Sequence, residues 1–149
     1  MRFINKKIIK ETIKEQPLVC LTAYTKPIAE LVYSFADIIL VGDSLGPVLY
    51  GFESTRKVTL EMMINHGKAV CQNSSNTNVV IDLPYGTYEC SEKIAYENAS
   101  KLINETGACG VKLEGGKKVA PIIEYLVKRN IYVMAHIGML PQSANNQDD

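Results

Sequence analysis

The sequence predicts an α/β fold built around a parallel sheet. Short runs of four or five mainly apolar residues recur along the chain, which is typical of strands that are buried on both faces. Segments with helical periodicity lie between these runs, so that strand and helix alternate five times. This alternation is the pattern of parallel strands that are joined by crossover helices.

The composition indicates one globular domain. Of 149 residues, 46% are hydrophobic and 21% are charged, which is enough apolar material for one sizeable core. Sixteen basic residues balance sixteen acidic residues, so no net charge favours a nucleic acid or an anionic membrane as partner. We therefore expect a single domain over residues 1–149 and a small-molecule ligand.

The cysteines and the absence of a long apolar run predict a cytoplasmic protein. No stretch approaches the 18 or so apolar residues of a membrane span, and the N-terminus lacks the apolar region of a signal peptide. Four cysteines lie far apart with no CxxC spacing, which favours reduced core residues over a zinc site. They are Cys20, Cys71, Cys90 and Cys109.

The first third of the chain predicts two helices and two strands. Isoleucines at helical spacing indicate an amphipathic helix within residues 1–16, which Pro17 ends. The apolar run 18–24 predicts the first strand. Thr25 is expected to cap a helix that extends to about residue 35. The next strand is the run IILV at 38–41.

A long connection with several turn residues follows the second strand. Residues 46–57 (GPVLYGFESTRK) contain glycine, proline and tyrosine, and we interpret them as a binding loop or lid. A surface connection without function is the alternative. Thr59 then predicts the cap of a helix that extends to about Cys71.

The second half of the chain repeats the alternation twice. NVVID (78–82) and GVKLE (110–114) predict strands, and Ser91 and Gly107 bracket the helix between them. The following helix lies between Pro121 and Asn130, and IYVMAH (131–136) predicts a fifth strand. The apolar residues of that last helix that we expect to face inward are Ile122, Ile123, Leu126 and Val127.

The positions of acidic residues favour a barrel over other parallel sheets. No glycine-rich dinucleotide turn and no phosphate-binding loop follows a strand. Acids instead end several strands, which is typical of a (β/α)8 TIM barrel, in which ligands bind at the carboxyl ends of the strands. Such a barrel takes roughly 250 residues. We therefore expect about five βα units of an incomplete barrel here, with the first and fifth strands as exposed edges.

Three strand ends carry the candidate metal site. Asp43 follows the second strand, Asp82 ends the third and Glu114 ends the fourth. Because carboxyl ends of parallel strands meet at one edge of the sheet, we expect these acids to lie together. A set of oxygen ligands with few protein members suits Mg²⁺.

The fourth strand adds a basic residue to this site. Residues two apart in a strand share a face, so Lys112 and Glu114 are expected to point into the barrel mouth while Val111 and Leu113 point away. Lys112 would then contact an anionic substrate. In the alternative interpretation, Lys112 and Glu114 form a structural ion pair and the two aspartates cap loops. His136 ends the fifth strand, either as a structural residue or as a donor at the same mouth.

Six segments of the chain carry a resemblance to a known family, namely LTAY (21–24), LVGDSLG (40–46), VTL (58–60), DLPYGTY (82–88), VKLEGG (111–116) and HIGMLPQS (136–143). They closely resemble segments of the ketopantoate hydroxymethyltransferases, the 3-methyl-2-oxobutanoate hydroxymethyltransferases of pantothenate synthesis. The resemblance implies a (β/α)8 barrel, a homo-oligomer, and Mg²⁺ as cofactor. It also implies that Asp43, Ser44, Asp82 and Lys112 bind the oxo acid, and that Asp43, Asp82 and Glu114 hold the metal.

The implied reaction is hydroxymethyl transfer from 5,10-methylenetetrahydrofolate to 3-methyl-2-oxobutanoate through a metal-stabilised enolate. In this family a glutamate from a later strand takes the C3 proton, and we expect that residue to lie beyond residue 149. The chain would thus correspond to the N-terminal portion of the family. The first alternative is a noncatalytic half-barrel that binds at most metal or 2-oxo acid. The second is another metal-dependent enzyme acting on 2-oxo acid enolates, such as a carbon–carbon lyase.

Overall fold

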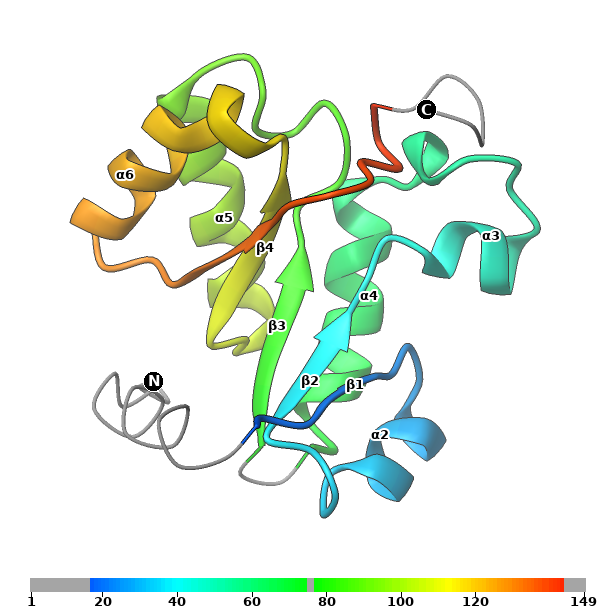
Figure 1. The fold of residues 1–149 in the computed structure, drawn as a ribbon. Coiled ribbons are helices and arrows are strands. Elements are labelled where there is room, and N and C mark those ends of the chain that lie inside the picture. The colour runs from blue at the N-terminus through cyan, green and yellow to red at the C-terminus, as the bar shows by residue number, and fades with distance from the viewer. Residues whose placement is uncertain (1–16, 75–76, 144–149) are drawn as a thin grey trace.

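The computed structural model describes residues 17–74 and 77–143, and the predicted helix within residues 1–16 lies outside them. The described chain alternates strands and helices as the sequence predicts, and two short 3-10 turns (η1 and η2) interrupt the connections (Figure 1). The elements are β1 (Cys20–Thr22), α2 (Lys26–Val32), β2 (Ile38–Val41), α3 (Leu45–Tyr50), η1 (Thr55–Lys57), α4 (Leu60–Cys71), β3 (Asn78–Asp82), α5 (Glu92–Thr106), β4 (Gly110–Glu114), η2 (Gly116–Val119), α6 (Ala120–Lys128) and β5 (Val133–His136).

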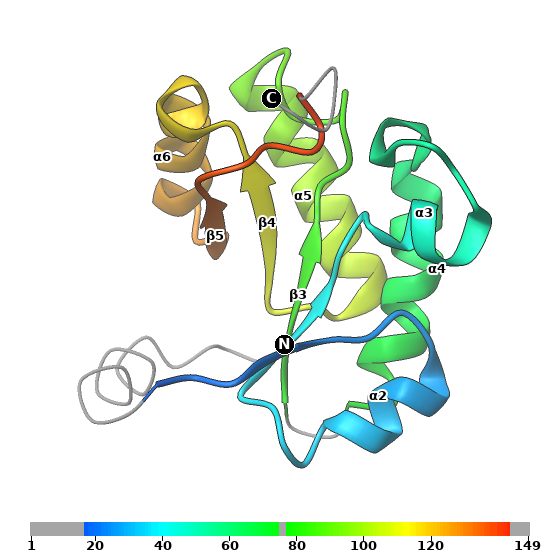
Figure 2. The same ribbon diagram turned by 45° about the vertical axis from the view of Figure 1, so that its right-hand side comes forward.

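The strands form one parallel sheet in the order β1-β2-β3-β4-β5. Helices α4 and α5 pack behind the central strands, and the opposite face of these strands carries no helix in the described chain (Figures 1 and 2). Within the described residues β1 and β5 pair on one side only. This confirms the predicted incomplete α/β barrel with the first and fifth strands at its edges.

The two faces of the sheet differ in burial. Alternate residues of each strand point to the same face. Those that point toward the helices are apolar and belong to the main core. On the opposite face a smaller apolar cluster, around Val80 and Cys109, lies below the polar residues of the strand ends. The strand residues of the main core include Ile39, Val41, Val79, Ile81, Val111 and Leu113.

The predicted caps of the two long helices are confirmed. The Thr59 hydroxyl accepts a hydrogen bond from the amide of Met62 at 3.2 Å, and the Ser91 hydroxyl accepts one from Ile94 at 3.2 Å. Each bond satisfies an amide that the first turn leaves without a partner. Gly107 ends α5 with φ of +78°, the left-handed conformation that glycine adopts readily.

Two predictions about helices are wrong. Residues 46–57 are not one loop, because α3 occupies 45–50 and η1 occupies 55–57. Pro47 lies in the first turn of α3, where its missing N–H breaks no bond, and Gly51 ends the helix with φ of +66°. Thr25 precedes α2 but makes no side-chain cap, and α2 ends at Val32 instead of near residue 35.

Burial corrects three further predictions. Cys20 is exposed because it lies on edge strand β1, and Cys90 is exposed in the connection before α5. Neither is therefore the core residue that the sequence predicts. Ile122 and Leu126 of α6 are buried and Ile123 is partly buried, as expected. Val127 is 43% exposed, since it lies toward the outer side of the helix.

None of the described helices has the length and apolar character that crossing a membrane requires.

Candidate active site at the strand ends

The acids of β2, β3 and β4 gather at the carboxyl edge of the sheet. Asp82 and Glu114 are the last residues of β3 and β4, and Asp43 follows β2 after Gly42. All three are buried, with exposed fractions of 7% for Asp43, 3% for Asp82 and 5% for Glu114. Buried carboxylates are costly without partners, so their contacts define what this edge can do.

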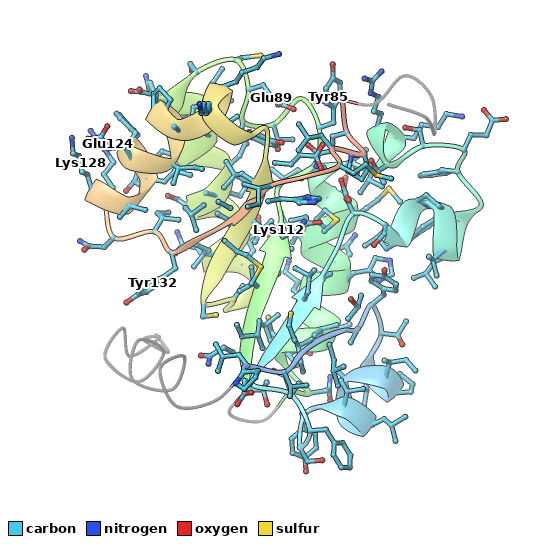
Figure 3. The ribbon with its side chains drawn as sticks, in the orientation of Figure 1. Tyr85, Glu89, Lys112, Glu124, Lys128 and Tyr132 are labelled. Atoms are coloured by element: carbon cyan, nitrogen blue, oxygen red, sulfur yellow. The ribbon has the colours of Figure 1, made fainter. Side chains whose placement is uncertain are left out.

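Lys112 pairs with Asp82 across neighbouring strands. The two residues are register partners, and Lys112 Nζ lies 2.7 Å from Asp82 Oδ1. Lys112 lies over the centre of the sheet (Figure 3), while Val111 and Leu113 are buried on the helix side. The predicted separation of the two faces of β4 is confirmed. The ion pair predicted as an alternative, Lys112 with Glu114, is replaced by this pair.

The backbone turn after β2 links Asp43 to Asp82. The amide of Asp43 donates a hydrogen bond to Asp82 Oδ2 at 3.1 Å. A side chain at Gly42 would place its Cβ only 2.9 Å from Ser44 Oγ and 3.5 Å from Asp82 Oδ2. A larger residue at this position would therefore require the Ser44 side chain to move, whereas its contact with the Asp82 carboxylate would be an ordinary van der Waals one.

Gln142 connects the three strand ends, a role that the sequence analysis did not assign. Its Nε2 donates to Asp43 Oδ2 at 2.7 Å and to the Leu83 carbonyl at 3.1 Å. Its backbone N–H donates a hydrogen bond to Glu114 Oε1 at 2.6 Å. Gln142 is 3% exposed. The only sequence signal for this role was the place of Gln142 in the segment HIGMLPQS. Neighbouring residues do not predict its contact with Asp43, because the two are 99 positions apart.

Tyr88 and Arg56 hold Gln142 in place. The Tyr88 hydroxyl lies 2.6 Å from Gln142 Oε1 and 3.0 Å from the Glu114 carbonyl, and the side chain is buried. Arg56 Nε donates to the Gln142 carbonyl at 2.7 Å, and its guanidinium lies 5.0 Å from the centre of the Tyr85 ring. Tyr85 lies near the carboxyl edge of the sheet, away from Glu124 and Lys128 on the outer helix (Figure 3).

Burial shifts the pKa values of Asp43 and Glu114 upward. Burial is the main cause that raises the pKa of Asp43 to about 6, and the negative charge of Asp82 adds to it. Burial likewise raises the pKa of Glu114. Lys112 is the basic side chain paired with this cluster. The cluster therefore carries more negative than positive charge when its acids are ionised.

His136 lies beside Glu114 at the end of β5. Its Nδ1 is 3.5 Å from Glu114 Oε2 and, although buried, has no hydrogen-bond partner among the described residues. Burial lowers the pKa of His136, and the positive charge of Lys112 lowers it further. The lowered pKa favours the uncharged imidazole, which does not offset the negative charge of the acids.

The donors at the strand ends fit a metal ion with few protein ligands. Among residues 17–74 and 77–143, no three acidic, histidine or cysteine side chains are arranged around a common ion position, and Gln142 donates hydrogen bonds to both Asp43 and Glu114. Asp43 and Asp82 nevertheless lie next to each other. Mg²⁺ commonly uses one or two carboxylates and completes its shell with water or substrate oxygens. The charge and chemistry of the donors fit such an ion.

Ser44 and His66 belong to a second group of contacts beside the acids. The Ser44 hydroxyl lies 2.7 Å from the Tyr24 hydroxyl. His66 Nδ1 lies 2.6 Å from the Tyr24 carbonyl oxygen, and its Nε2 lies 2.8 Å from the Tyr50 hydroxyl. The sequence assigns no role to His66, because it lies in the middle of a predicted helix with no acidic or thiol partner near it.

Solved structures share this fold at low sequence identity. A 2,3-dimethylmalate lyase of the PEP mutase/isocitrate lyase superfamily superposes with a TM-score of 0.63 at 13% identity, over 87% of this chain and 50% of that one. A phosphonopyruvate hydrolase, solved in complex with oxalate and Mg²⁺, gives a TM-score of 0.66 at 10% identity, over 89% and 52%. These enzymes are TIM barrels, so the likeness shows that the five strands form part of such a barrel.

Curated relatives are much closer in sequence. The Brucella canis protein named 3-methyl-2-oxobutanoate hydroxymethyltransferase is 49% identical to this chain, over 95% of this chain and 52% of the relative. The one from Paramagnetospirillum magneticum is 55% identical, over 87% and 47%. The chain thus spans about half the length of the curated relatives it matches. Because the family model for ketopantoate hydroxymethyltransferase also matches residues 2–148, the chain belongs to the ketopantoate hydroxymethyltransferase family.

Proposed function

We propose that this chain binds 3-methyl-2-oxobutanoate together with Mg²⁺, and that it takes part in hydroxymethyl transfer from 5,10-methylenetetrahydrofolate to give ketopantoate. Family membership and the names of the relatives support the reaction. The low-identity barrel solved with oxalate and Mg²⁺ supports the ligand class, because oxalate and a 2-oxo acid both present oxygens on adjacent carbons.

The observation that carries the proposal is the charge imbalance at the strand ends. Three buried carboxyl groups share one lysine, and burial raises the pKa of Asp43 to about 6. Because like charges in a buried site repel, the ionised cluster binds a divalent cation more favourably than it binds water alone. A structural ion pair between Lys112 and Asp82 would leave Asp43 and Glu114 uncompensated.

Asp43 and Asp82 would hold the metal. Glu114, the expected third ligand, would add negative charge beside it, since no three acidic side chains of the described residues surround a common ion position. A bound Mg²⁺ would polarise the keto group and make the C3–H of the substrate more acidic. Gln142 fixes the Asp43 carboxylate by donating to one of its oxygens. The other Asp43 oxygen is then available to a ligand, as expected of a site whose donors are set before binding.

Lys112 and Ser44 would bind the carboxylate of the oxo acid. Lys112 is 16% exposed at its side chain, so its ammonium group is accessible from the uncovered face of the sheet. Ser44 is exposed and lies directly next to Asp43. A base must also take the C3 proton. In the mechanism that the resemblance implies, this base is a glutamate that is not among these 149 residues.

Binding without catalysis is a second candidate function. It is favoured by the contacts at the strand ends, where the acids bind Lys112 or Gln142 and none of them is assigned as the base that takes the C3 proton. Under this proposal the chain binds Mg²⁺ and oxo acid but does not remove the C3 proton.

Exchange of the C3 hydrogen for deuterium separates the two functions. The 149-residue chain is incubated in D₂O with 3-methyl-2-oxobutanoate and Mg²⁺ but without folate, and the C3 signal is followed by NMR. Exchange above the rate of the Asp82→Asn variant supports the enzyme. Oxo-acid binding in a parallel calorimetric titration, without exchange, supports the binding function. The absence of both rejects the proposed ligand.

A cytoplasmic location and a homo-oligomeric state complete the proposal. The free cysteines support a reducing compartment. Exposed apolar side chains on α3, namely Val48, Leu49 and Tyr50, are compatible with a contact between subunits. Sedimentation of the chain would test the oligomeric state.

A further inference from the structure

His66 on α4 contacts two segments that flank Ser44. One ring nitrogen contacts the carbonyl of Tyr24, whose own hydroxyl contacts Ser44. The other ring nitrogen contacts the hydroxyl of Tyr50, the last residue of α3, and α3 begins immediately after Ser44. The contacts therefore form a closed series: Ser44 is joined through α3 to Tyr50, Tyr50 to His66, His66 to Tyr24, and Tyr24 back to Ser44. We call this series the circuit.

The chemistry of these partners fixes the tautomer of the neutral imidazole. A carbonyl oxygen only accepts hydrogen bonds, so Nδ1 of His66 must carry the hydrogen that it shares with Tyr24 at 2.6 Å. In the neutral ring Nε2 is then an acceptor, and the Tyr50 hydroxyl donates to it. Tyr50 also packs edge-on against the ring, with centroids 5.8 Å apart, which restricts the orientation of the ring.

The Tyr24 and Ser44 hydroxyls together leave one hydrogen for a ligand. Each hydroxyl has one hydrogen, and the 2.7 Å contact between them uses one of the two. Whichever residue donates, the other O–H remains free to donate outward. When Tyr24 donates, the remaining hydrogen is on Ser44, which is exposed beside Asp43, and it can then meet an anionic oxygen at the mouth of the site.

We propose that His66 is a positioning residue for the Tyr24–Ser44 hydroxyl pair, and that this pair donates a hydrogen bond to the carboxylate of the 2-oxo acid. The inference rests on the proposed function for the identity of the ligand. His66 itself does not touch the substrate. It acts through the Tyr24 backbone and through the end of α3, so its loss weakens oxo-acid binding without removing a metal donor.

Three substitutions separate the contacts of this circuit. His66→Asn keeps an N–H close to the position of Nδ1, whereas His66→Gln places its amide near Nε2 and gives up the donor toward Tyr24. Tyr24→Phe removes the hydroxyl that contacts Ser44. Asn65→Ala is the matched control, because Asn65 is an exposed neighbour on the same helix for which no hydrogen bond is found within the described chain.

Calorimetric titrations measure two ligands with each variant, Mg²⁺ alone and 3-methyl-2-oxobutanoate in saturating Mg²⁺. We expect His66→Gln and Tyr24→Phe to weaken oxo-acid binding roughly two- to tenfold, the effect of one lost hydrogen bond. His66→Asn should lose less than His66→Gln, and Mg²⁺ affinity should stay unchanged in all variants. Equal oxo-acid affinity in every variant, or a parallel loss of Mg²⁺ affinity and thermal stability, overturns the positioning role.

Nitrogen-15 NMR of the His66 ring tests the circuit independently of the substrate. We expect the neutral ring to carry its hydrogen on Nδ1 and not on Nε2, and a changed Nε2 signal in Tyr50→Phe. A ring protonated at Nε2 instead contradicts the circuit. If the wild-type chain does not bind the oxo acid, the proposed function fails, whereas the ring signals still decide whether His66 is fixed as described.

Discussion

The two faces of strand β4 show how one segment serves stability and chemistry separately. Val111 and Leu113 point to the helices and are almost completely buried in the main core. Lys112 and Glu114, which alternate with them, point to the opposite face and belong to the polar network. The helix side of the sheet is stabilised by apolar packing, which many sequences satisfy. The inner side depends on particular partners, so changes there should alter binding more than folding.

The largest expected effect on stability comes from the helix side. Leu113→Ala removes a side chain that is 1% exposed and should lower the free energy of unfolding by about 2–5 kcal/mol, because the packed core cannot fill the cavity. Urea unfolding measures this change. Met134→Ala, on the inner face of the neighbouring strand and only partly buried, should lose less than half as much. Equal losses would show that the two faces do not differ.

Gln142 is the inner-face residue with the largest expected effect on stability. Gln142→Met keeps an unbranched side chain of similar length but leaves Asp43 and Tyr88 without the contacts seen at 2.7 Å and 2.6 Å. The free energy of unfolding should fall by about 1–3 kcal/mol, since buried polar groups lose partners. Denaturant titration compares this variant with Met139→Ala, which alters a 62% exposed side chain. Identical midpoints would show that the network does not stabilise the fold.

Lys112→Ala should change binding in opposite directions for the two ligands. It removes the positive charge that would contact the oxo-acid carboxylate, so oxo-acid affinity should fall about tenfold, as for a lost charge-assisted bond. Removing that charge also leaves Asp82 Oδ1 free and the acid cluster more negative, so Mg²⁺ affinity should be kept or increased. Isothermal titration with each ligand gives the ranking. A larger loss for Mg²⁺ than for oxo acid would make Lys112 a structural partner of the acids.

Asp43→Asn should raise stability at neutral pH by a small amount. The folded pKa of Asp43 is about 6, above the unfolded value of about 3.9, so the folded state binds more protons between these pH values. Stability from this group is therefore present below about pH 4 and is lost as pH rises through about 6. Asp43→Asn has no charge to bury, so this loss of stability with rising pH does not occur in the variant. The substitution also weakens the hydrogen bond that residue 43 accepts from Gln142 Nε2.

Thermal unfolding from pH 4 to 8 without divalent cations tests this sign. At pH 7 the variant should melt a few degrees higher than the wild type, given roughly 2–4 °C per kcal/mol for a chain of this size. Below pH 4 the order should disappear or reverse. A variant that is less stable at pH 7 would show that the Asp43 charge is compensated in the fold.

Sequence patterns predicted which strand residues pack against the helices and which acids lie at the strand ends. Both depend on the order of residues within a single segment. Strand β4 and helix α5 have the predicted bounds, since their apolar spacing, cap residue and terminal glycine lie within each segment. The gathering of Asp43, Asp82 and Glu114 at one edge followed from parallel topology alone. Residues 46–57 were misassigned because Gly46 and Pro47 indicate a loop, yet both are tolerated in the first turn of α3.

The partners within the site could not be predicted from the sequence. Lys112 pairs with Asp82 instead of Glu114 because cross-strand register brings those two side chains together. The role of Gln142 depends on how residues 137–142 pass over the strand ends, and His66 depends on the packing of α4 against the segment before α2. Each of these contacts joins residues far apart in the chain, where spacing and capping carry no information.

The central claim is that the acids of β2 and β3 bind a divalent cation, and calorimetric titration of Mg²⁺ at pH 7.5 tests it most directly. The wild-type chain should give a saturable binding signal, and Asp43→Asn and Asp82→Asn should each lose it while remaining folded by circular dichroism. Unchanged Mg²⁺ binding in both variants would contradict the account.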